Sequence, residues 1–310
     1  MRALVARRLD GPDAIELIET PVPRPGPGQV RIEVAAAAVN PVDVGTANGA
    51  LVRIGLTPPR DQFGLGWDVA GTVDAVGLGV DLAVGTSVVG LSDLLGRPLK
   101  THAEQVVLDA AAVTPAPRGL DPVEASTIPL NALTADQALD ALALPAGAAL
   151  LVTGAAGAVG GYAVQLARHR GLDVVATAAA ADEALVRGLG ARHFVPRGAD
   201  LPTAVRELVP GGVDGALDAA IVGVAAQEAV RNRGAFAHLV ATPAPPHLRG
   251  IRVHTVLVSA DGDRLRRLVG LAGAGIIGTR VAGVHALDDA AAAYRKVAGG
   301  GLRGRLVLTP

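Results

Sequence analysis

The sequence has 310 residues, of which half are hydrophobic and 40 are glycine, and this length predicts a globular protein of two domains. It contains no cysteine, which excludes disulfides, thiol nucleophiles, iron–sulfur clusters and thiolate zinc sites. The formal net charge is −1, so no basic surface for a phosphate backbone is evident. The chain has only three Phe, two Tyr and one Trp, too few for a surface on which bases stack. We therefore expect no nucleic-acid partner.

The N-terminal segment MRALVARRLDG lacks the apolar region of a signal peptide. No stretch of the chain approaches the roughly 20 uninterrupted apolar residues that a membrane-spanning helix needs. We therefore expect a cytoplasmic protein that does not bind membranes.

Short strands separated by turns are predicted from Met1 to about Leu120. The clearest are GQVRIEVAAAAV, DVAGTVDAVG and GTSVVGL, with glycines at their ends. Frequent glycine at strand ends and corners suits a tightly curved β-barrel, where the backbone bends sharply. The proline-rich segment from Thr20 to Gln29 is expected to be an extended loop that leads into the strand at Val30–Val34.

The pattern changes after Leu120. Asp121 is placed to cap a helix whose first turn contains Pro122 and Glu124. Strands and helices then alternate in the order LLVTG, YAVQLARHRG, DVVATA, DEALVRGLG, FVPRG, AVRELV, GALDAA, AAQEAVRN and AFAHLVAT. This alternation predicts parallel strands joined by crossover helices, so the fold class is α/β. The last stretch, LDDAAAAYRKVAGGGLRGRLVLTP, predicts one more helix, a glycine-rich turn and a strand.

The segment LLVTGAAGAVGGYAVQLAR predicts a dinucleotide-binding turn between a buried strand and a helix that opens near Val159. Ala155, Gly157 and Gly160 occupy the three glycine positions of that fingerprint, the first of them substituted by alanine. Gly157 allows the backbone to approach a pyrophosphate, and the N–H groups at the helix start receive the anion. A tight turn without a ligand is the alternative. The expected contacts are Ala155, Ala156, Gly157, Ala158, Val159 and Gly160.

The end of the strand DVVATA predicts NADPH rather than NADH. An NAD-binding protein places a carboxylate here for the ribose 2′-hydroxyl, whereas this chain has Thr177 followed by two alanines. A 2′-phosphate can therefore be accommodated, with a cation supplied by Arg187, Arg192 or Arg197, of which Arg197 is the expected contact. Asp182 and Glu183 weigh against this prediction, although both read more naturally as first-turn helix residues.

The sequence resembles the medium-chain dehydrogenase/reductase superfamily, and within it the zinc-independent quinone oxidoreductase or enone reductase branch. The resemblance covers essentially the whole chain. It is carried by VNPVDV (39–44), GWDVAGTVDAVG (66–77), PLNALTADQAL (129–139), VTGAAGAVGGYAVQLAR (152–168), RGLGARHFV (187–195) and GRLVL (304–308). It implies a GroES-like β-barrel domain of residues 1–120 and 275–310, rejoined by the C-terminal strand. Residues 121–274 would then form a doubly wound Rossmann domain that binds NADP(H).

Zinc-dependent relatives have a cysteine where this chain has Asn40 and a histidine where it has Trp67. Asp68 alone does not make a site that normally needs three protein ligands and an open position. The histidines, His102 among them, are scattered singly. We therefore expect no metal.

The resemblance also implies site residues. The Asn of the NP-x-D motif reaches the nicotinamide ribose or substrate region in that branch, which transfers to Asn40 with Asp43 beside it. Thr134 resembles a threonine that lies near the nicotinamide. The segments Leu239–Thr242 and Val256–Val258 resemble backbone stretches that flank the cofactor, which implies contacts from Ala241, Val256 and Val258.

Leu51, Phe63 and Trp67 are expected to line an apolar substrate pocket, although core packing explains Trp67 equally well. Many relatives carry a substrate-positioning Tyr in the loop that corresponds to residues 50–64, and this chain has none there. Tyr162 and Tyr294 are expected to serve packing. The proton that follows hydride transfer then comes from water or from an unidentified residue.

These observations predict an NADPH-dependent, zinc-independent oxidoreductase that transfers hydride to a quinone or an α,β-unsaturated carbonyl compound. Lack of zinc favours such acceptors, since the enolate formed from an enone needs neither a metal nor a strong acid. Two alternatives stay open: an enoyl reductase that acts on an acyl thioester, and a non-catalytic NADPH-binding partner protein. RVHTVLVS (252–259) is a candidate edge strand for a homodimer.

Overall fold

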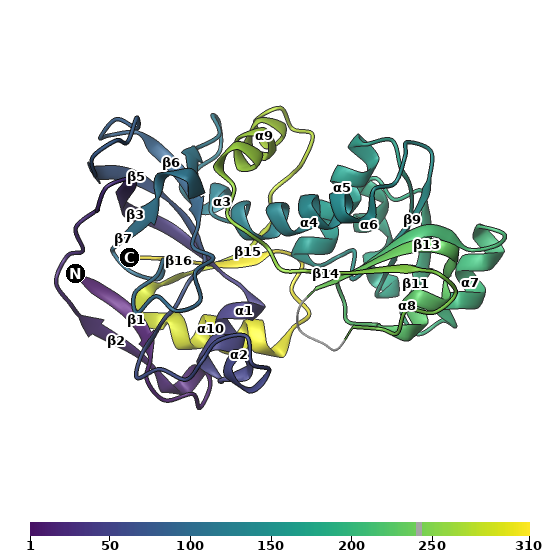
Figure 1. Ribbon diagram of the computed structural model, residues 1–310, viewed down its shortest axis with the longest axis horizontal. Coiled ribbons are helices and arrows are strands. Elements are labelled where there is room, and N and C mark those ends of the chain that lie inside the picture. Colours follow the sequence, from purple (N-terminus) through teal and green to yellow (C-terminus); the bar gives the residue numbers. More distant parts are fainter. Residues whose placement is uncertain (240–243) are drawn as a thin grey trace. The chain divides into compact units, whose positions relative to one another are not determined.

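The computed structural model describes residues 1–239 and 244–310 (Figure 1). The chain divides into two compact units. The first unit comprises Met1–Leu130, Ser259–Gly275 and Thr279–Pro310, and the second comprises Asn131–Val258 and Ile276–Gly278.

The unit limits differ from the predicted limits at residues 120 and 275. The segment Ser259–Gly275 belongs to the first unit, because helix α9 (Gly262–Gly273) packs against strand β8 (Val113–Pro115). Gly262 lies close to that strand, where an added Cβ would meet the carbonyl oxygen of Val113 at 2.8 Å.

The first unit contains two β-sheets. A three-stranded sheet has the order β2-β1-β4, and a seven-stranded sheet has the order β15-β16-β3-β5-β6-β8, with β7 also paired to β3. The strands are β1 (Arg2–Ala6), β2 (Ile15–Glu19), β3 (Gln29–Val39), β4 (Phe63–Gly64), β5 (Asp68–Val76), β6 (Ser87–Leu91), β7 (Gln105–Asp109), β15 (Val281–Ala286) and β16 (Arg305–Thr309). The helices other than α9 are α1 (Pro41–Ala47), α2 (Ala50–Arg53), α3 (Pro122–Ala125) and α10 (Ala290–Gly299).

Strand β3 is the centre of the larger sheet, and the predicted strands GQVRIEVAAAAV, DVAGTVDAVG and GTSVVGL are β3, β5 and β6. Val30, Ile32 and Val34 alternate along β3 and are buried in a core of Val and Leu side chains. Such period-two alternation is what a half-buried strand requires. Gly71 of β5 lies so close to β3 that an added Cβ would be 2.1 Å from the carbonyl oxygen of Glu33.

The C-terminal strand returns to the N-terminal part of the chain, as the resemblance implied. Leu306 of β16 pairs with Val39 of β3 in antiparallel register. Helix α10 precedes β16 and places Tyr294, which is fully buried, in a second core with Leu4 and Leu65. Strands β15 and β16 near the C-terminus therefore complete a sheet whose first strand in the sequence, β3, begins at Gln29.

A buried hydrogen-bonded pair crosses this second core. The hydroxyl of Tyr294 lies 2.8 Å from Nδ1 of His102, and Nε2 of His102 lies 3.1 Å from the carbonyl oxygen of Ala38. Because a carbonyl only accepts, Nε2 carries the proton, and Nδ1 of the neutral ring accepts from the tyrosine. Burial lowers the pKa of His102, which favours this neutral form.

The second unit is a six-stranded parallel sheet with the order β11-β10-β9-β12-β13-β14. Its strands and helices, in chain order, are α4 (Pro129–Leu142), β9 (Ala149–Thr153), α5 (Ala158–His169), β10 (Asp173–Ala178), α6 (Glu183–Leu189), β11 (His193–Pro196), α7 (Leu201–Leu208), β12 (Val213–Asp218), α8 (Val224–Glu228), β13 (Val230–Leu239) and β14 (Arg252–Val256). The order reverses between β9 and β12, which is the doubly wound arrangement that binds dinucleotides.

Two details of the helices differ from the prediction. The helical pattern after Leu120 is interrupted before Pro129, since proline cannot donate to the preceding turn. It therefore forms α3, capped by Asp121 as expected, and a separate α4. The predicted helix AAQEAVRN ends at Glu228, and Val230 already pairs with β12.

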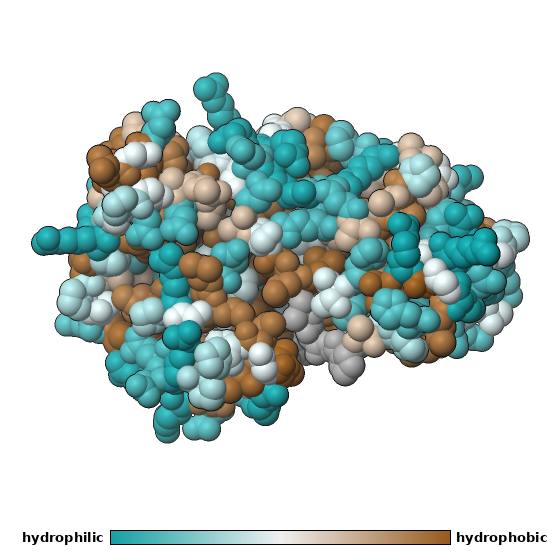
Figure 2. All heavy atoms as spheres, in the orientation of Figure 1, coloured by the Kyte–Doolittle hydropathy of each residue, from teal (hydrophilic) through white to brown (hydrophobic). Residues whose placement is uncertain are grey.

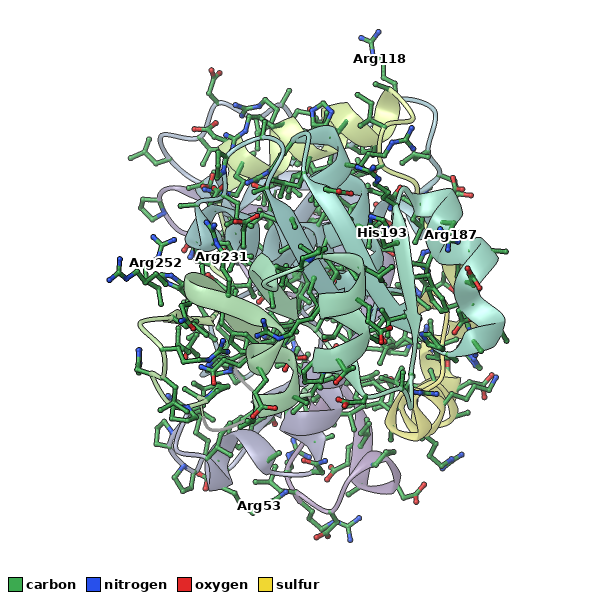
Figure 3. All side chains as sticks on the ribbon, turned by 90° about the vertical axis from the view of Figure 1, so that its right-hand side faces the viewer. Arg53, Arg118, Arg187, His193, Arg231 and Arg252 are labelled. Carbon is green, nitrogen blue, oxygen red and sulfur yellow. The ribbon has the colours of Figure 1, made fainter. Side chains whose placement is uncertain are left out.

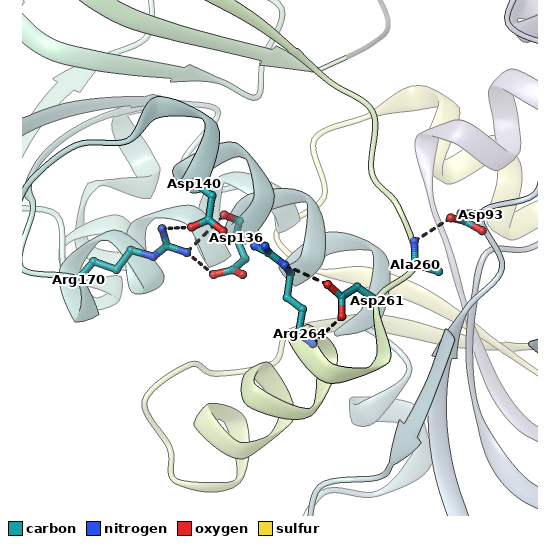
Figure 4. A network of polar contacts seen from close by, with 7 residues as sticks. All are labelled: Asp93, Asp136, Asp140, Arg170, Ala260, Asp261 and Arg264. Atoms are coloured by element: carbon teal, nitrogen blue, oxygen red, sulfur yellow. Dashed lines mark hydrogen bonds and ion pairs between the residues drawn. The ribbon is translucent and has the colours of Figure 1, made fainter. Parts of the chain in front are cut away.

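Arg170 at the end of α5 fastens this helix to α4. It donates to Asp140 at 2.7 Å and also bonds Asp136 (Figure 4). Because Asp136 is buried, its ion pair with Arg170 is less screened by solvent than the ion pair between Arg170 and Asp140.

Hydrophilic and hydrophobic residues are interspersed over the face shown in Figure 2. Exposed apolar side chains are common on folded proteins and need no special explanation when scattered. Within the described part of the chain, none of the helices has the length and apolarity that crossing a membrane requires.

We predict that Tyr294→Phe lowers the free energy of unfolding by about 1–3 kcal/mol, because the buried Nδ1 of His102 loses its donor. Denaturant unfolding at pH 7.5 measures this. The same substitution in a His102→Phe background should cost much less, so equal losses in both backgrounds would show that the hydrogen bond is not the cause.

Candidate functional site

The turn after β9 has the geometry that a dinucleotide needs. Gly154 adopts a left-handed backbone conformation (φ 60°), and Gly157 precedes the first residue of α5. At Gly160 an added Cβ would lie 2.2 Å from the carbonyl oxygen of Gly154, so only glycine lets the helix pack this closely on the turn. The first N–H groups of an α-helix have no acceptor within the helix, so the start of α5 is suited to receive an anion. The predicted residues Ala155–Gly160 thus fit a pyrophosphate.

The other predicted cofactor contacts meet at the same edge of the sheet. Thr177 lies near the carboxyl end of β10, and its carbonyl oxygen accepts from the N–H of Ala155 at 3.1 Å. Arg197 directly follows β11, and its N–H donates to the carbonyl oxygen of Ala178. Val256 ends β14, and Val258 follows it. Ala241 lies outside the described residues. The carboxyl ends of parallel strands are where such folds bind ligands.

The three candidate arginines have different surroundings. Arg187, on the surface of α6 (Figure 3), donates to Glu183 at 2.8 Å, and Arg192 donates to Asp173 at 3.0 Å, at the amino end of β10. Arg197 is exposed, and no side-chain partner for it is found in residues 1–239 and 244–310. The pairing of Glu183 agrees with its reading as a helix-face residue.

Asp218 is a site feature that the sequence analysis missed. It ends β12, beside β9 at the reversal of strand order, and is buried. Its Oδ1 accepts from the hydroxyl of Thr153 at 2.6 Å and from the N–H of Val222 at 3.0 Å, and its Oδ2 accepts from the N–H of Gly223 at 2.7 Å. These bonds hold Ile221 in a left-handed conformation (φ 58°) that β-branched residues rarely adopt. Asp218 therefore fixes the loop at the strand reversal.

Thr134 lies on α4 and is buried. Asn40 and Asp43, the other predicted catalytic residues, belong to the first unit and are fully buried. The structure brings Asn40 and Asp43 together at the start of α1, where Asp43 Oδ2 accepts from the N–H of Asn40 at 2.8 Å. The catalytic roles of these three residues stay predictions.

Asp68, at the start of β5, joins this group. Its Oδ2 accepts from the side-chain amide of Asn40 at 2.6 Å, and its Oδ1 accepts from the N–H of Leu130 at 2.6 Å. Asp43 Oδ1 accepts in turn from the N–H of Gly66 at 2.9 Å. Two buried carboxylates thus have all four oxygens occupied, which is what burial of such groups demands.

Burial is the main cause that raises the pKa of Asp68 to about 7. The hydrogen bonds from Leu130 and Asn40 and the charge of Arg305 lower it, whereas the nearby charge of Asp43 raises it. Asp68 consequently changes protonation near neutral pH, far above the range of an exposed aspartate.

Trp67 lies against a buried lysine. The Nζ of Lys100 is 3.9 Å from the centre of the Trp67 ring, a cation–π distance. The N–H of His102 donates to the carbonyl of Leu65 at 2.9 Å. An added Cβ at Gly66 would be 2.4 Å from that same N–H nitrogen of His102, so glycine permits the two segments to lie this close.

The remaining predicted substrate residues are also buried. Phe63 belongs to β4 and pairs with Ala6 of β1, and Leu51 lies in α2. The exposed fractions are 1% for Phe63, 9% for Leu51 and 3% for Trp67. Their contact with a substrate stays a prediction. Within residues 1–239 and 244–310, no group of three or more His, Asp or Glu side chains is arranged to hold a metal.

Family models match both halves of the chain. The "alcohol dehydrogenase GroES-like domain" matches residues 26–118, and the "zinc-binding dehydrogenase" domain matches residues 158–258. The chain is 32% identical over 276 residues to the chloroplastic NADPH-dependent alkenal/one oxidoreductase of Arabidopsis thaliana, covering 86% of this chain and 68% of that protein.

The chain belongs to the medium-chain dehydrogenase/reductase superfamily. Its place is in the quinone oxidoreductase and enone reductase branch, and its fold is the GroES-like plus Rossmann fold that the sequence predicted. The second unit has the Rossmann fold, which binds nicotinamide cofactors in this superfamily.

Two further similarities bear on its chemistry. The chain is 34% identical over 297 residues to erythronolide synthase EryA2 of Saccharopolyspora erythraea, covering 91% of this chain but only 8% of that protein. A solved structure described as an NAD-dependent alcohol dehydrogenase has 31% identity and a TM-score of 0.89, and the match covers 100% of both chains.

We predict that Asp68→Asn becomes more stable relative to the wild type as the pH rises from about 4 to above 7. The pKa of Asp68 is about 7 in the native state and 3.8 in the unfolded state. Between these two pH values the unfolded state has released the proton that the native state still holds, so the free energy of unfolding of the wild type falls as the pH rises. The asparagine of the variant does not titrate, and the variant escapes this loss. The difference in the free energy of unfolding should reach on the order of a few kcal/mol.

Denaturant titrations at pH 5, 6, 7 and 8 measure this difference. Asp81→Asn, at an exposed carboxylate of the same unit, is the control and should show no such trend. A difference between Asp68→Asn and wild type that is constant across the four pH values would contradict the raised pKa.

Proposed function

We propose that this protein is an NADPH-dependent oxidoreductase that transfers hydride to a quinone or an α,β-unsaturated carbonyl compound without zinc. The observation that carries the proposal is the carboxyl edge of the parallel sheet. There the glycine turn, Thr177 and Arg197 lie together, and no carboxylate ends β10.

The residues divide the binding of the cofactor between them. The backbone from Ala155 to Gly160 would receive the pyrophosphate, and Asp218 would hold the neighbouring loop in place. Arg197 would pair with the 2′-phosphate as a charged donor. When bound, NADPH supplies the hydride.

Asn40, Asp43 and Thr134 remain the proposed catalytic-site residues. The two carboxylates of Asp43 and Asp68 fix the backbone and the amide of Asn40, which keeps this side chain in one orientation. A neutral, rigid amide can orient a polar group without attracting the hydride.

The identity of the acceptor is supported by two kinds of relative. The similarity to an alkenal/one oxidoreductase supports an enone. The similarity to polyketide synthases supports the second candidate, an enoyl thioester. The chain spans less than a tenth of the length of each of three such synthases to which it is similar. Both substrates contain a carbon–carbon double bond conjugated to a carbonyl.

A turnover assay tests the proposal. NADPH and NADH are each titrated by fluorescence, and a benzoquinone, cyclohex-2-enone and the crotonyl thioester of N-acetylcysteamine are then added while absorbance at the nicotinamide band is followed. Enzyme-dependent loss of NADPH with the quinone or the enone is expected. Turnover of the thioester alone would favour the enoyl reductase. NADPH binding without any turnover would leave a non-catalytic binding protein.

We predict that Arg197→Ala weakens NADPH binding by about 10- to 100-fold and leaves NADH binding nearly unchanged, since a charge-assisted hydrogen bond to phosphate contributes about 1.5–3 kcal/mol. Fluorescence titration measures both dissociation constants. Arg192→Ala is the control, because Arg192 is paired with Asp173 at the other end of β10. Equal losses for both cofactors would contradict the assignment.

A further inference from the structure

The second unit has a pocket at the opposite end of its sheet from the cofactor turn. The pocket has a volume of about 630 Å³ and lies where β12 and β13 begin. It is lined by residues 209–212, by Asn232 and by four charged side chains, which are Arg206, Asp214, Arg231 and Arg249. Strand β12 separates it from the carboxyl edge by six residues, a distance of about 20 Å. The pocket is therefore a separate place from the proposed NADPH site.

The charges in this pocket do not cancel. Arg231 (Figure 3) pairs with Asp214 at 2.7 Å, and the other oxygen of Asp214 accepts from the N–H of Ala149 at 2.7 Å. Arg206 and Arg249 make no ion pair with any acidic side chain that the structure describes. Three arginines and one aspartate leave a net charge of +2 in the pocket.

Backbone carbonyls hold the two unneutralised guanidinium groups close together. Nη2 of Arg206 donates to the carbonyl oxygen of Glu228 at 2.6 Å, and Nη2 of Arg249 donates to that of Gln227 at 2.8 Å. Nη2 of Arg249 is also 3.5 Å from the oxygen of Glu228. The two nitrogens thus lie no further apart than the sum of their distances to that oxygen, about 6 Å.

Capping of α8 accounts for only part of this arrangement. Gln227 and Glu228 end α8, which has five residues, and a helix end carries a partial charge of about −0.5. One arginine already exceeds that charge, and a second one at the same end adds repulsion between like charges. A guanidinium has five N–H donors, so each of these two keeps donors that the carbonyls do not use.

The backbone around the pocket is held in conformations that favour this cluster. Arg249 (φ 56°) and Arg233 (φ 63°) adopt the left-handed conformation, which is uncommon for residues other than glycine, and the N–H of Arg233 donates to the carbonyl oxygen of Arg249 at 3.0 Å. At Gly212 an added Cβ would lie 3.2 Å from Nη1 of Arg206. Glycine at this position leaves the space beside the guanidinium open.

We propose that this pocket binds a phosphate dianion, either free or carried as a monoester by a small organic molecule. A dianion matches the net charge of +2, and the planar donors of two neighbouring arginines suit the oxygens of a phosphate. The volume lies in the range of pockets for small organic ligands, and Val209 and Pro210 add apolar surface for the organic part. The inference goes beyond the proposed function, because it requires neither the nicotinamide cofactor nor a hydride acceptor.

Titration of the wild-type protein tests the site directly. Inorganic phosphate, ribose 5-phosphate, ribose and acetate are each titrated by calorimetry in the presence of saturating NADPH. The two phosphates should bind at least about 10-fold more tightly than ribose or acetate. Tighter binding of ribose 5-phosphate than of phosphate indicates a monoester as the ligand, and equal binding indicates free phosphate. Failure of both phosphates to bind would overturn the inference.

Amide signals in ¹⁵N-labelled protein locate the bound phosphate. Those of Gly212 and Asn232 should shift on addition of phosphate. Shifts confined to residues 155–160 would place the anion in the cofactor turn and would overturn the inference.

Substitutions separate an anion site from a helix cap. Arg206→Gln and Arg249→Gln should each weaken phosphate binding by about 10-fold or more, with NADPH affinity unchanged. Arg192→Gln, at an exposed arginine of the same unit that pairs with Asp173, is the matched control and should bind phosphate as the wild type does. Lower stability with unchanged phosphate affinity in the two pocket variants would show that these arginines only cap α8.

Asp214→Asn gives a result that loss of folding cannot imitate. It raises the net charge of the pocket from +2 to +3, so phosphate should bind several-fold more tightly. Weaker or unchanged binding would contradict the proposal. All these measurements are made without an acceptor, so phosphate binding without turnover leaves the inference standing, and turnover without phosphate binding overturns the inference alone.

Discussion

The buried carboxylate of Asp68 is the constraint on which the first unit depends. One oxygen holds the side chain of Asn40 and the other holds the N–H of Leu130, residues 28 and 62 positions away in the sequence. A desolvated carboxylate must be paired or protonated, so this group fixes the start of β5 against the start of α1 and against the backbone of Leu130, within the first unit. Trp67 immediately precedes Asp68, and the Nζ of Lys100 lies 3.9 Å from the centre of the Trp67 ring.

In the second unit, backbone groups rather than side chains form the predicted binding site for the cofactor. Its pyrophosphate site depends on glycine at the closest approach of α5 to the turn and on the N–H groups that a helix leaves unpaired. Asp218 adds a buried carboxylate whose bonds are all local to the strand reversal. The second unit thus offers fixed N–H donors for an anionic cofactor. The first unit contains Asp68 and Lys100, whose pKa values burial shifts to about 7.

The sequence predicted the parts of the structure that local patterns encode. The glycine turn, the alternation after Leu120 and the Asp121 cap depend on neighbouring residues. Asp218 and Lys100 escaped prediction because their environments come from distant residues: Thr153 is 65 positions from Asp218, and Trp67 lies on a different segment from Lys100. Nor can a pattern show that Phe63 is fully buried or that Arg192 is engaged at the far end of β10.

The most direct test of the account follows isotopes into the product. The enzyme is supplied with NADPH that carries deuterium at C4 of the nicotinamide, prepared separately on each face, and with cyclohex-2-enone in ordinary water. The account predicts a saturated ketone with one deuterium at the β-carbon from one of the two cofactor preparations and a solvent-derived proton at the α-carbon. A product that contains no deuterium from either preparation, or no product while both are bound, would contradict it.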